Sequence, residues 1–101
     1  MDIQKLMKQA QEMQAGMQKT QEELSAKTVE ANVGGGKVSV IANGSGEVQS
    51  ITIDPSVVDP EDVEFLQDLV LSGVQEAIAK GKEMATTEMS KLTGGLGIPG
   101  M

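Results

Sequence analysis

Between Thr28 and Asp54 the sequence alternates apolar and polar residues, and two clusters of glycine interrupt the alternation. Alternation with a period of two is typical of β-strands that bury one face. Glycine accepts the positive φ angles that tight hairpins need. The stretch therefore predicts three strands joined by two hairpins, which is an antiparallel meander.

Two-residue turns at Gly34-Gly35 and Gly44-Ser45 give a specific register, with positive φ expected at Gly44. Ala31 then faces Val38, and Val38 faces Ile51. Seven apolar residues come to lie on one side of the sheet: Val29, Ala31, Val33, Val38, Val40, Ile51 and Ile53. A slip of one residue would scatter them over both faces. The other face is polar except for Ile41, which this register places opposite Val48.

The segment Gly34-Gly35-Gly36-Lys37 has the composition of a phosphate-binding loop but not its pattern. A P-loop requires G-x-x-x-x-G-K-[ST] between a strand and a helix. Here Val38 follows the lysine, and a strand follows rather than a helix. The dinucleotide pattern G-x-G-x-x-G fails too, because Ser39 and Gln49 stand where its last glycine belongs. The glycines are interpreted as turns, so we expect no cofactor and no small-molecule substrate.

Residues 2–27 predict an amphipathic helix. Apolar or small residues recur at spacings of three and four, as in a heptad repeat: Ile3, Leu6, Ala10, Met13, Met17, Thr20 and Leu24. The helix can pack on its own domain, or it can also pair with another helix along this seam. Thr20 and Gly16 favour the first alternative.

A second, longer helix is predicted after the sheet. Asp59-Pro60-Glu61-Asp62 combines a capping residue, a proline suited to the first helical position and acids suited to the first turn. We prefer this interpretation of the acids to a metal site. The helix is expected to run through Leu92, to loosen at Gly81 and to end at Gly94-Gly95. The chain is then one α+β domain over residues 1–93, with a flexible Gly/Pro-rich tail over residues 94–101.

The lengths of the helices predict a homodimer with projecting helical arms. A helix of about 25 residues measures roughly 37 Å, whereas a six-residue strand measures roughly 20 Å. Both apolar stripes must therefore extend beyond the sheet, and a second copy is the simplest cover for them. The residues expected in the dimer interface are Met13, Met17, Ile41, Val48, Val74 and Ile78.

Composition excludes several classes of function. The 101 residues include no cysteine, histidine or arginine, and the net charge is −7. Catalysis by a thiolate or an imidazole is thus impossible, and no spacing of acids, lysines or serines indicates an enzyme. No apolar run has the length of a membrane span, and the N-terminus lacks the features of a signal peptide. We expect a cytoplasmic protein that does not enter the membrane.

Four segments together resemble one known family: QKLMKQAQEMQ, GGGKVSVIANGSGEVQSITIDPSVV, EDVEFLQDLV and KLTGGLGIPGM. The chain resembles the YbaB/EbfC family of bacterial nucleoid-associated proteins almost from end to end. The resemblance implies a small dimer with projecting helices that binds duplex DNA and influences nucleoid organisation. On this basis the expected phosphate contacts are Lys5, Lys8, Lys19, Lys80, Lys82 and Lys91.

Without arginine the chain lacks the commonest contact to guanine, so such binding would carry little sequence specificity. The alternative is a protein-interaction adaptor without strong DNA binding. It would use a methionine-rich stripe on the helices: Met7, Met13, Met17, Met84 and Met89.

Overall fold

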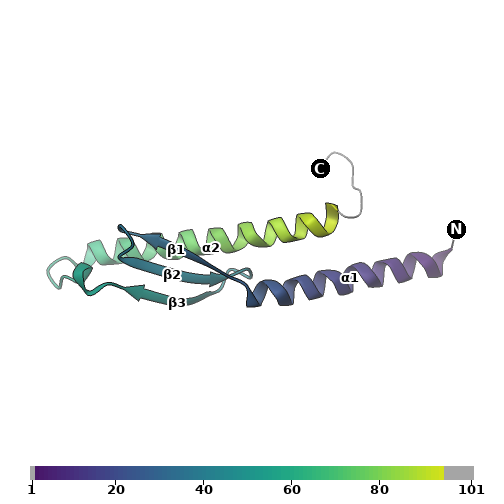
Figure 1. Ribbon diagram of the computed structural model, residues 1–101, viewed down its shortest axis with the longest axis horizontal. Coiled ribbons are helices and arrows are strands. Elements are labelled where there is room, and N and C mark those ends of the chain that lie inside the picture. Colours follow the sequence, from purple (N-terminus) through teal and green to yellow (C-terminus); the bar gives the residue numbers. More distant parts are fainter. Residues whose placement is uncertain (1, 95–101) are drawn as a thin grey trace.

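The computed structural model describes residues 2–94, which form two helices and one sheet. The elements are α1 (Ile3–Ala26), β1 (Thr28–Val33), β2 (Val38–Asn43), β3 (Val48–Ile53), a 3-10 helix η1 (Pro55–Val57) and α2 (Val63–Gly94). The strands form an antiparallel sheet in the order β1-β2-β3. The predicted α-β-β-β-α order is confirmed. Both helices extend beyond the same end of the sheet and run antiparallel to each other there (Figure 1).

The first hairpin is longer than predicted. Val33 pairs with Val38, so the loop contains four residues and not two, and Ala31 faces Val40 rather than Val38. The reason is that Gly34, Gly35 and Gly36 all have positive φ, at 62°, 68° and 86°. Three successive left-handed residues do not fit a two-residue turn. The register moves by two residues, and because the period of a strand is also two, the apolar side chains keep their predicted face.

The second hairpin also differs, and it contains a β-bulge. A register shift between Ile41 and Ala42 places Ser50 opposite Ile41 and Val48 opposite Ala42. The predicted pairing of Ile41 with Val48 is therefore wrong, and Val48 lies on the α2 side of the sheet. The residue with positive φ is Gly46, at 82°, and not Gly44.

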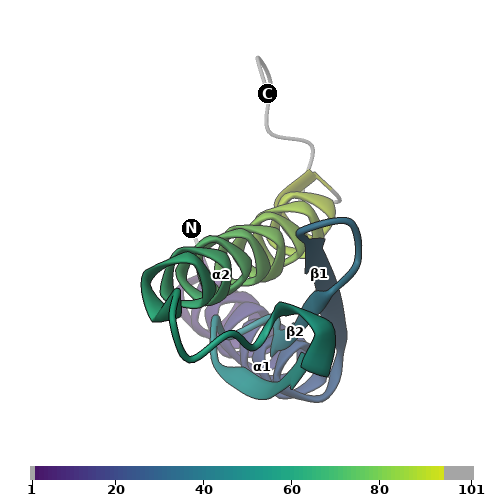
Figure 2. The ribbon, with the colours of Figure 1, turned by 90° about the vertical axis from the view of Figure 1, so that its left-hand side faces the viewer.

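The core lies between α2 and the first two strands. It contains Ala31, Val38, Val40, Ala42 and Ala77, all fully buried. α2 packs mainly on β1 and β2 and hardly touches β3, as the end-on view in Figure 2 illustrates for β1 and β2. As a result β3 keeps apolar side chains exposed on a face that is covered in β1 and β2.

Small residues let α2 approach the sheet closely. Gly73, Ala77 and Gly81 recur every four residues and are all buried, so they share one face of the helix. A Cβ atom at Gly73 would lie 2.9 Å from Cγ2 of Val40, and a Cβ at Gly81 would run into the carbonyl oxygen of Asn43. The expected loosening at Gly81 is not observed, because α2 is continuous through it. The glycine permits close approach of the backbone instead.

α2 begins three residues later than predicted. The N–H of Asp62 donates to the carbonyl oxygen of Asp59 at 2.9 Å, closing a turn that precedes the helix. Asp62 then acts as the cap, with Oδ1 accepting from the N–H of Phe65 at 3.3 Å. At its other end α2 reaches Gly94. Residues 95–101, which make up most of the predicted tail, lie outside the described residues. In the part that the structure covers, neither helix is long and apolar enough to cross a membrane.

α1 is attached to the sheet at its base. Among residues 3–26, Leu24 alone is buried. Gly44 lies directly against it: the Gly44 N–H donates to the Leu24 carbonyl at 2.8 Å, and a Cβ at Gly44 would lie 2.8 Å from the Leu24 side chain. Nδ2 of the buried Asn43 donates to the Ser25 carbonyl at 3.2 Å and to a Glu47 carboxylate oxygen at 2.9 Å. The second hairpin thus fixes the C-terminal end of α1.

Candidate nucleic-acid interface

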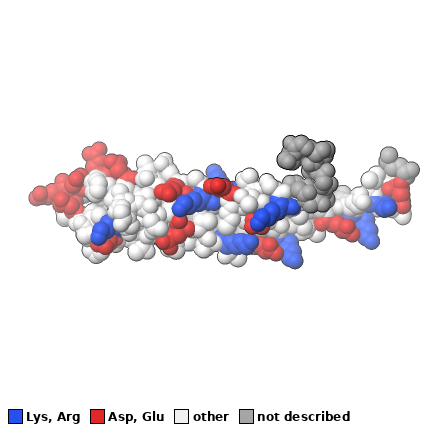
Figure 3. Space-filling view, turned by 45° about the horizontal axis from the view of Figure 1, so that its top comes forward, with Lys and Arg blue, Asp and Glu red and all other residues white. Residues whose placement is uncertain are grey.

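All side-chain positive charge in the chain comes from eight lysines. The six lysines expected to contact DNA lie on α1 and on the second half of α2, and all are exposed. In Figure 3 most of the lysine surface lies over the middle and the arm end of the molecule, interleaved with acids, while the opposite end carries a dense acidic cluster with only a small basic patch near it. The arms therefore present separate cationic side chains rather than one continuous basic patch.

Two of the six expected contact residues are engaged within the molecule. Nζ of Lys80 donates to the carbonyl oxygen of Glu30 in β1 at 3.1 Å and lies 3.8 Å from the Glu76 carboxylate. Nζ of Lys91 lies 3.7 Å from Glu88. A phosphate would have to compete with these partners, so both lysines are weaker candidates than the prediction assumed.

The other four, Lys5, Lys8, Lys19 and Lys82, make no ion pair with any residue between 2 and 94. With about 100° between successive helical residues, Lys5, Lys8 and Lys19 fall within an arc of about 60° on α1, opposite the apolar seam. Glu12 falls in the same arc and lowers its net charge. Lys82 lies on α2, with its alkyl chain beside Gly46 of the second hairpin.

One charged contact between the helices was not predicted. Nζ of Lys27, at the end of α1, lies 3.7 Å from the Glu88 carboxylate on α2. Glu88 is half-buried and also faces Lys91, so it links both helices. The two partners are remote in sequence, and only the antiparallel packing of the arms brings them together. No local sequence signal could have revealed this pair.

The acidic end, which is the end of the molecule opposite the arms, consists of turn and capping residues. Asp59 Oδ1 accepts from the N–H of Glu61 at 3.0 Å, and Asp54 Oδ1 accepts from the N–H of Ser56 at 2.8 Å. That backbone hydrogen bond, with a smaller effect of Lys37 at 3.6 Å, holds the pKa of Asp54 below its usual value. In residues 2–94 no group of acids is arranged to hold a metal ion.

The residues expected at a dimer interface fall on three separate surfaces. Val74 lines an apolar groove of about 420 Å³ on α2, together with Leu66, Gln67, Val70 and Leu71. Ile78, one turn further, lies near Gly46, and Val48 is exposed on β3. Ile41 is half-buried on the opposite face of the sheet. Met13 and Met17 are exposed on α1.

The methionines of the alternative hypothesis are divided as well. Met7, Met13 and Met17 on α1 are exposed, whereas Met84 and Met89 on α2 are half-buried, and Met89 lies near Leu24 and Gly44. Three of the five methionines of the predicted stripe are therefore exposed to a partner, and all three lie on α1.

Comparison with known proteins gives a consistent result. Residues 1–96 match the profile of the YbaB/EbfC DNA-binding family. A nucleoid-associated protein of Ruminiclostridium cellulolyticum is 59% identical over 97 residues, covering 95% of this chain and 84% of the relative. A nucleoid-associated protein of Acetivibrio thermocellus is 58% identical over 101 residues, covering 99% and 89%. The crystal structure of an uncharacterized protein from Helicobacter pylori superposes with a TM-score of 0.64 at 27% identity, covering 77% of this chain and 90% of that one.

Proposed function

The chain belongs to the YbaB/EbfC DNA-binding family, and we propose that it is a nucleoid-associated protein that binds duplex DNA as a homodimer. Its contacts are lysine to phosphate, made from the helical arms, with little dependence on base sequence. It acts in the cytoplasm, at the nucleoid, as the names of its relatives suggest.

The observation that best supports this proposal is the distribution of unpaired lysines. Lys5, Lys8, Lys19 and Lys82 all lie on α1 or α2, whereas Lys37, near the acidic end, is bound to Asp54 at 3.6 Å. A phosphate backbone gains most from cations that have no competing carboxylate. The arms therefore offer the strongest attachment, and the acidic end repels a polyanion.

A homodimer is supported by an apolar corner between α2 and β3. Lys80 on α2 reaches the backbone of β1, while Ile78 and Lys82 lie beside Gly46 in the hairpin that leads into β3. The groove residues Val74 and Leu71 share the flank of Ile78 because they lie one and two turns before it. The groove therefore opens toward β3.

Exposed apolar side chains continue across β3 from this groove. Val48, Ile51 and Ile53 are 37%, 43% and 36% exposed on the strand, and Leu71 is 56% exposed on the helix. A continuous apolar surface formed by a helix and an edge strand is typical of an interface between subunits. A twofold contact through this corner would cover Val48, Val74 and Ile78 and leave both arms projecting. Ile41 points to the other face of the sheet and does not fit the same contact.

The proposal is tested by titrating duplex DNA at two salt concentrations. The slope of log affinity against log salt should approach about −0.9 for each phosphate contact, so a small number of lysines predicts a modest slope. Replacing Lys5 and Lys8 together by glutamate should weaken binding on all sequences alike. Replacing Lys80 and Lys82 should do the same. Binding that is absent at low salt, or that survives both double substitutions, contradicts the proposal.

A matched pair of single substitutions makes the test sharper. Lys82→Ala removes a lysine without an ion pair, whereas Lys80→Ala removes one that is held by Glu30 and Glu76. The first should weaken DNA binding more than the second.

The homodimer is tested separately. Light scattering should report twice the chain mass of 10.6 kDa for the native protein, and the mass of a single chain for Leu71→Glu.

If DNA binding fails these tests, the adaptor hypothesis takes its place. The observation that favours it is the exposure of Met7, Met13 and Met17 along α1. Methionine is over-represented at adaptable protein-binding surfaces. Loss of partner binding in the variant Met13→Gln with Met17→Gln, while the dimer persists, would then support the adaptor.

A further inference from the structure

The N-terminal end of α1 extends beyond the end of α2, and no other residue between 2 and 94 covers its apolar seam there. Figure 1 shows this end as the tip of the molecule, past the last turn of α2. Ile3 is 68% exposed, the largest value among the exposed large apolar residues of the described chain, and Leu6 and Met7 are about half exposed. Ile3, Leu6, Ala10 and Met13 follow the three-four spacing of a heptad seam. The tip therefore presents apolar knobs without a partner helix.

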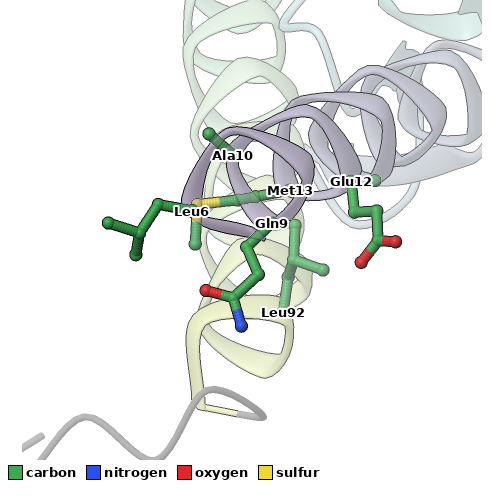
Figure 4. A pocket seen from close by; sticks show the side chains of 7 residues that line it. Leu6, Gln9, Ala10, Glu12, Met13 and Leu92 are labelled. Carbon is green, nitrogen blue, oxygen red and sulfur yellow. The ribbon is translucent and has the colours of Figure 1, made fainter. Parts of the chain in front are cut away.

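A groove lies directly below these knobs. It has a volume of about 640 Å³ and is lined by Leu6, Gln9, Ala10, Glu12, Met13 and Gly16 of α1 and by Leu92 of α2. Figure 4 shows Leu6, Met13 and Leu92 around it. Gly16 has no side chain to fill the space, and a Cβ there would lie 3.7 Å from Cδ1 of Leu92. The groove is thus closed at one end by the last turns of α2 and open toward the tip.

We propose that this tip and groove form a self-complementary contact with a second copy of the chain. The two α1 helices pair antiparallel, tip to tip, so that Ile3 of each copy enters the groove beside Met13 of the other. In the same register Leu6 packs against Ala10. One alignment therefore satisfies every seam residue from position 3 to position 13, which is the condition for an isologous twofold contact. Leu92, in the last turn of α2, limits the overlap to about 11 residues, or about 16 Å.

The charges favour a second copy over another partner. Met7, Gln9 and Gln14 beside the seam are uncharged, and Glu12 is the single charged residue that lines the groove, so the charges there are too few to favour a strongly acidic or a strongly basic helix. Residues 2–13, which comprise the overlapping segment and the capping Asp2, carry two lysines and two acids and have no net charge. The acidic cluster lies at the other end of the molecule (Figure 3). The tip is accordingly where two copies of a chain of net charge −7 approach with least repulsion.

This contact is distinct from the dimer at the α2–β3 corner, and its small size makes it the weaker of the two. Sedimentation velocity from micromolar to millimolar concentration, without DNA, should show further association of the native chain. Leu6→Gln should weaken that association by about tenfold or more, since each contact buries two copies of Leu6. Lys8→Gln, the control on the opposite face of the same turn, should leave it unchanged. Equal behaviour of the native chain and Leu6→Gln overturns the proposal.

Disulfide trapping provides a second readout, because the chain contains no cysteine of its own. Gln9 lies on the flank of the seam, about one residue from the proposed twofold axis, and Lys8 faces away from it. Under a mild oxidant Gln9→Cys should give linked pairs, and adding Leu6→Gln should suppress them. Lys8→Cys that links equally fast contradicts the proposal. In Leu71→Glu, which disrupts the corner dimer, the Gln9→Cys link should persist, so that failure of one contact is distinguished from failure of the other.

Discussion

Gly81→Ala is the substitution for which helix propensity and the packing of this fold predict opposite changes in stability. Glycine within a helix is about 1 kcal/mol less favourable than alanine, so propensity alone predicts that the variant is more stable. Here, however, the added methyl group would run into the carbonyl oxygen of Asn43. Asn43 is buried, and its carbonyl accepts the N–H of Gly46 at 3.1 Å. The obstacle is backbone in a hydrogen-bonded turn and not the end of a flexible side chain.

The size of the stability loss in Gly81→Ala depends on how the strain can be relieved. α2 has to move away from the second hairpin, which loosens the contact of Ala77 with the sheet one turn earlier. Overpacking of a core usually destabilises by about 1–3 kcal/mol, and an obstacle made of backbone places this case at the upper end. After the gain in helix propensity of about 1 kcal/mol, the net loss should be about 2 kcal/mol. For a domain of this size that corresponds to a Tm lower by about 8–16 °C.

Gly16→Ala is the matched control, since Gly16 lies in the middle of α1. A Cβ there meets only Cδ1 of Leu92, at the ordinary contact distance of 3.7 Å. Helix propensity should dominate, so the free energy of unfolding of this variant should rise by up to about 1 kcal/mol. Both variants would be unfolded thermally by circular dichroism at the same protein concentration, because association shifts the apparent Tm. A Gly81→Ala protein as stable as the native chain would refute the close approach of α2 to Asn43.

Three further substitutions test separate parts of the structure. Gly44→Val should destabilise the fold, since its Cβ would lie 2.9 Å from the Leu24 carbonyl oxygen. Amide hydrogen exchange at the C-terminal end of α1 should become faster, and unchanged protection there would disprove the contact. Lys37→Ala should leave stability almost unchanged, because its bridge to Asp54 is exposed, and calorimetry should find no nucleotide affinity in either protein. The lowered pKa of Asp54 makes its carboxylate stabilising above about pH 3.8, the unfolded value. The stability difference between native protein and Asp54→Asn should therefore vanish as the pH falls through the folded pKa, and a difference that persists at lower pH would contradict the assigned cause.

Much of the fold follows from local pattern. The alternation between Thr28 and Ile53 is sufficient to predict three strands and the side that most residues face. The error in the first turn left the faces unchanged, whereas the bulge in the second hairpin moved Val48 to the α2 side. Turn length was harder to predict. Consecutive glycines such as Gly34 and Gly35 are compatible with loops of several lengths, and the φ angles that decide between them depend on the whole hairpin.

The role of a single glycine was the least predictable feature. Gly44 and Gly81 both carry the sequence signals of flexibility or a turn, yet each is required by a neighbour distant in sequence: Leu24 in one case and Asn43 in the other. The same limit applies to the lysines. Exposure on the arms could be predicted from helical periodicity, but the partners of Lys80 and Lys27 come from other elements.

The separation of charge along the molecule has a kinetic consequence. Acids at one end and unpaired lysines toward the other give the protein an electric dipole moment along its long axis, and the molecule measures 71 Å in that direction. In the field of a polyanion a torque acts on such a dipole before any side chain makes contact. The acidic end turns away and the arms turn inward, so that more collisions are productive than random orientation would allow. At physiological ionic strength this torque acts only within about 8 Å of the polyanion surface. Orientation is thus selected during the final approach, and neutralising acids at the remote end would change the association rate more than the lifetime of the complex.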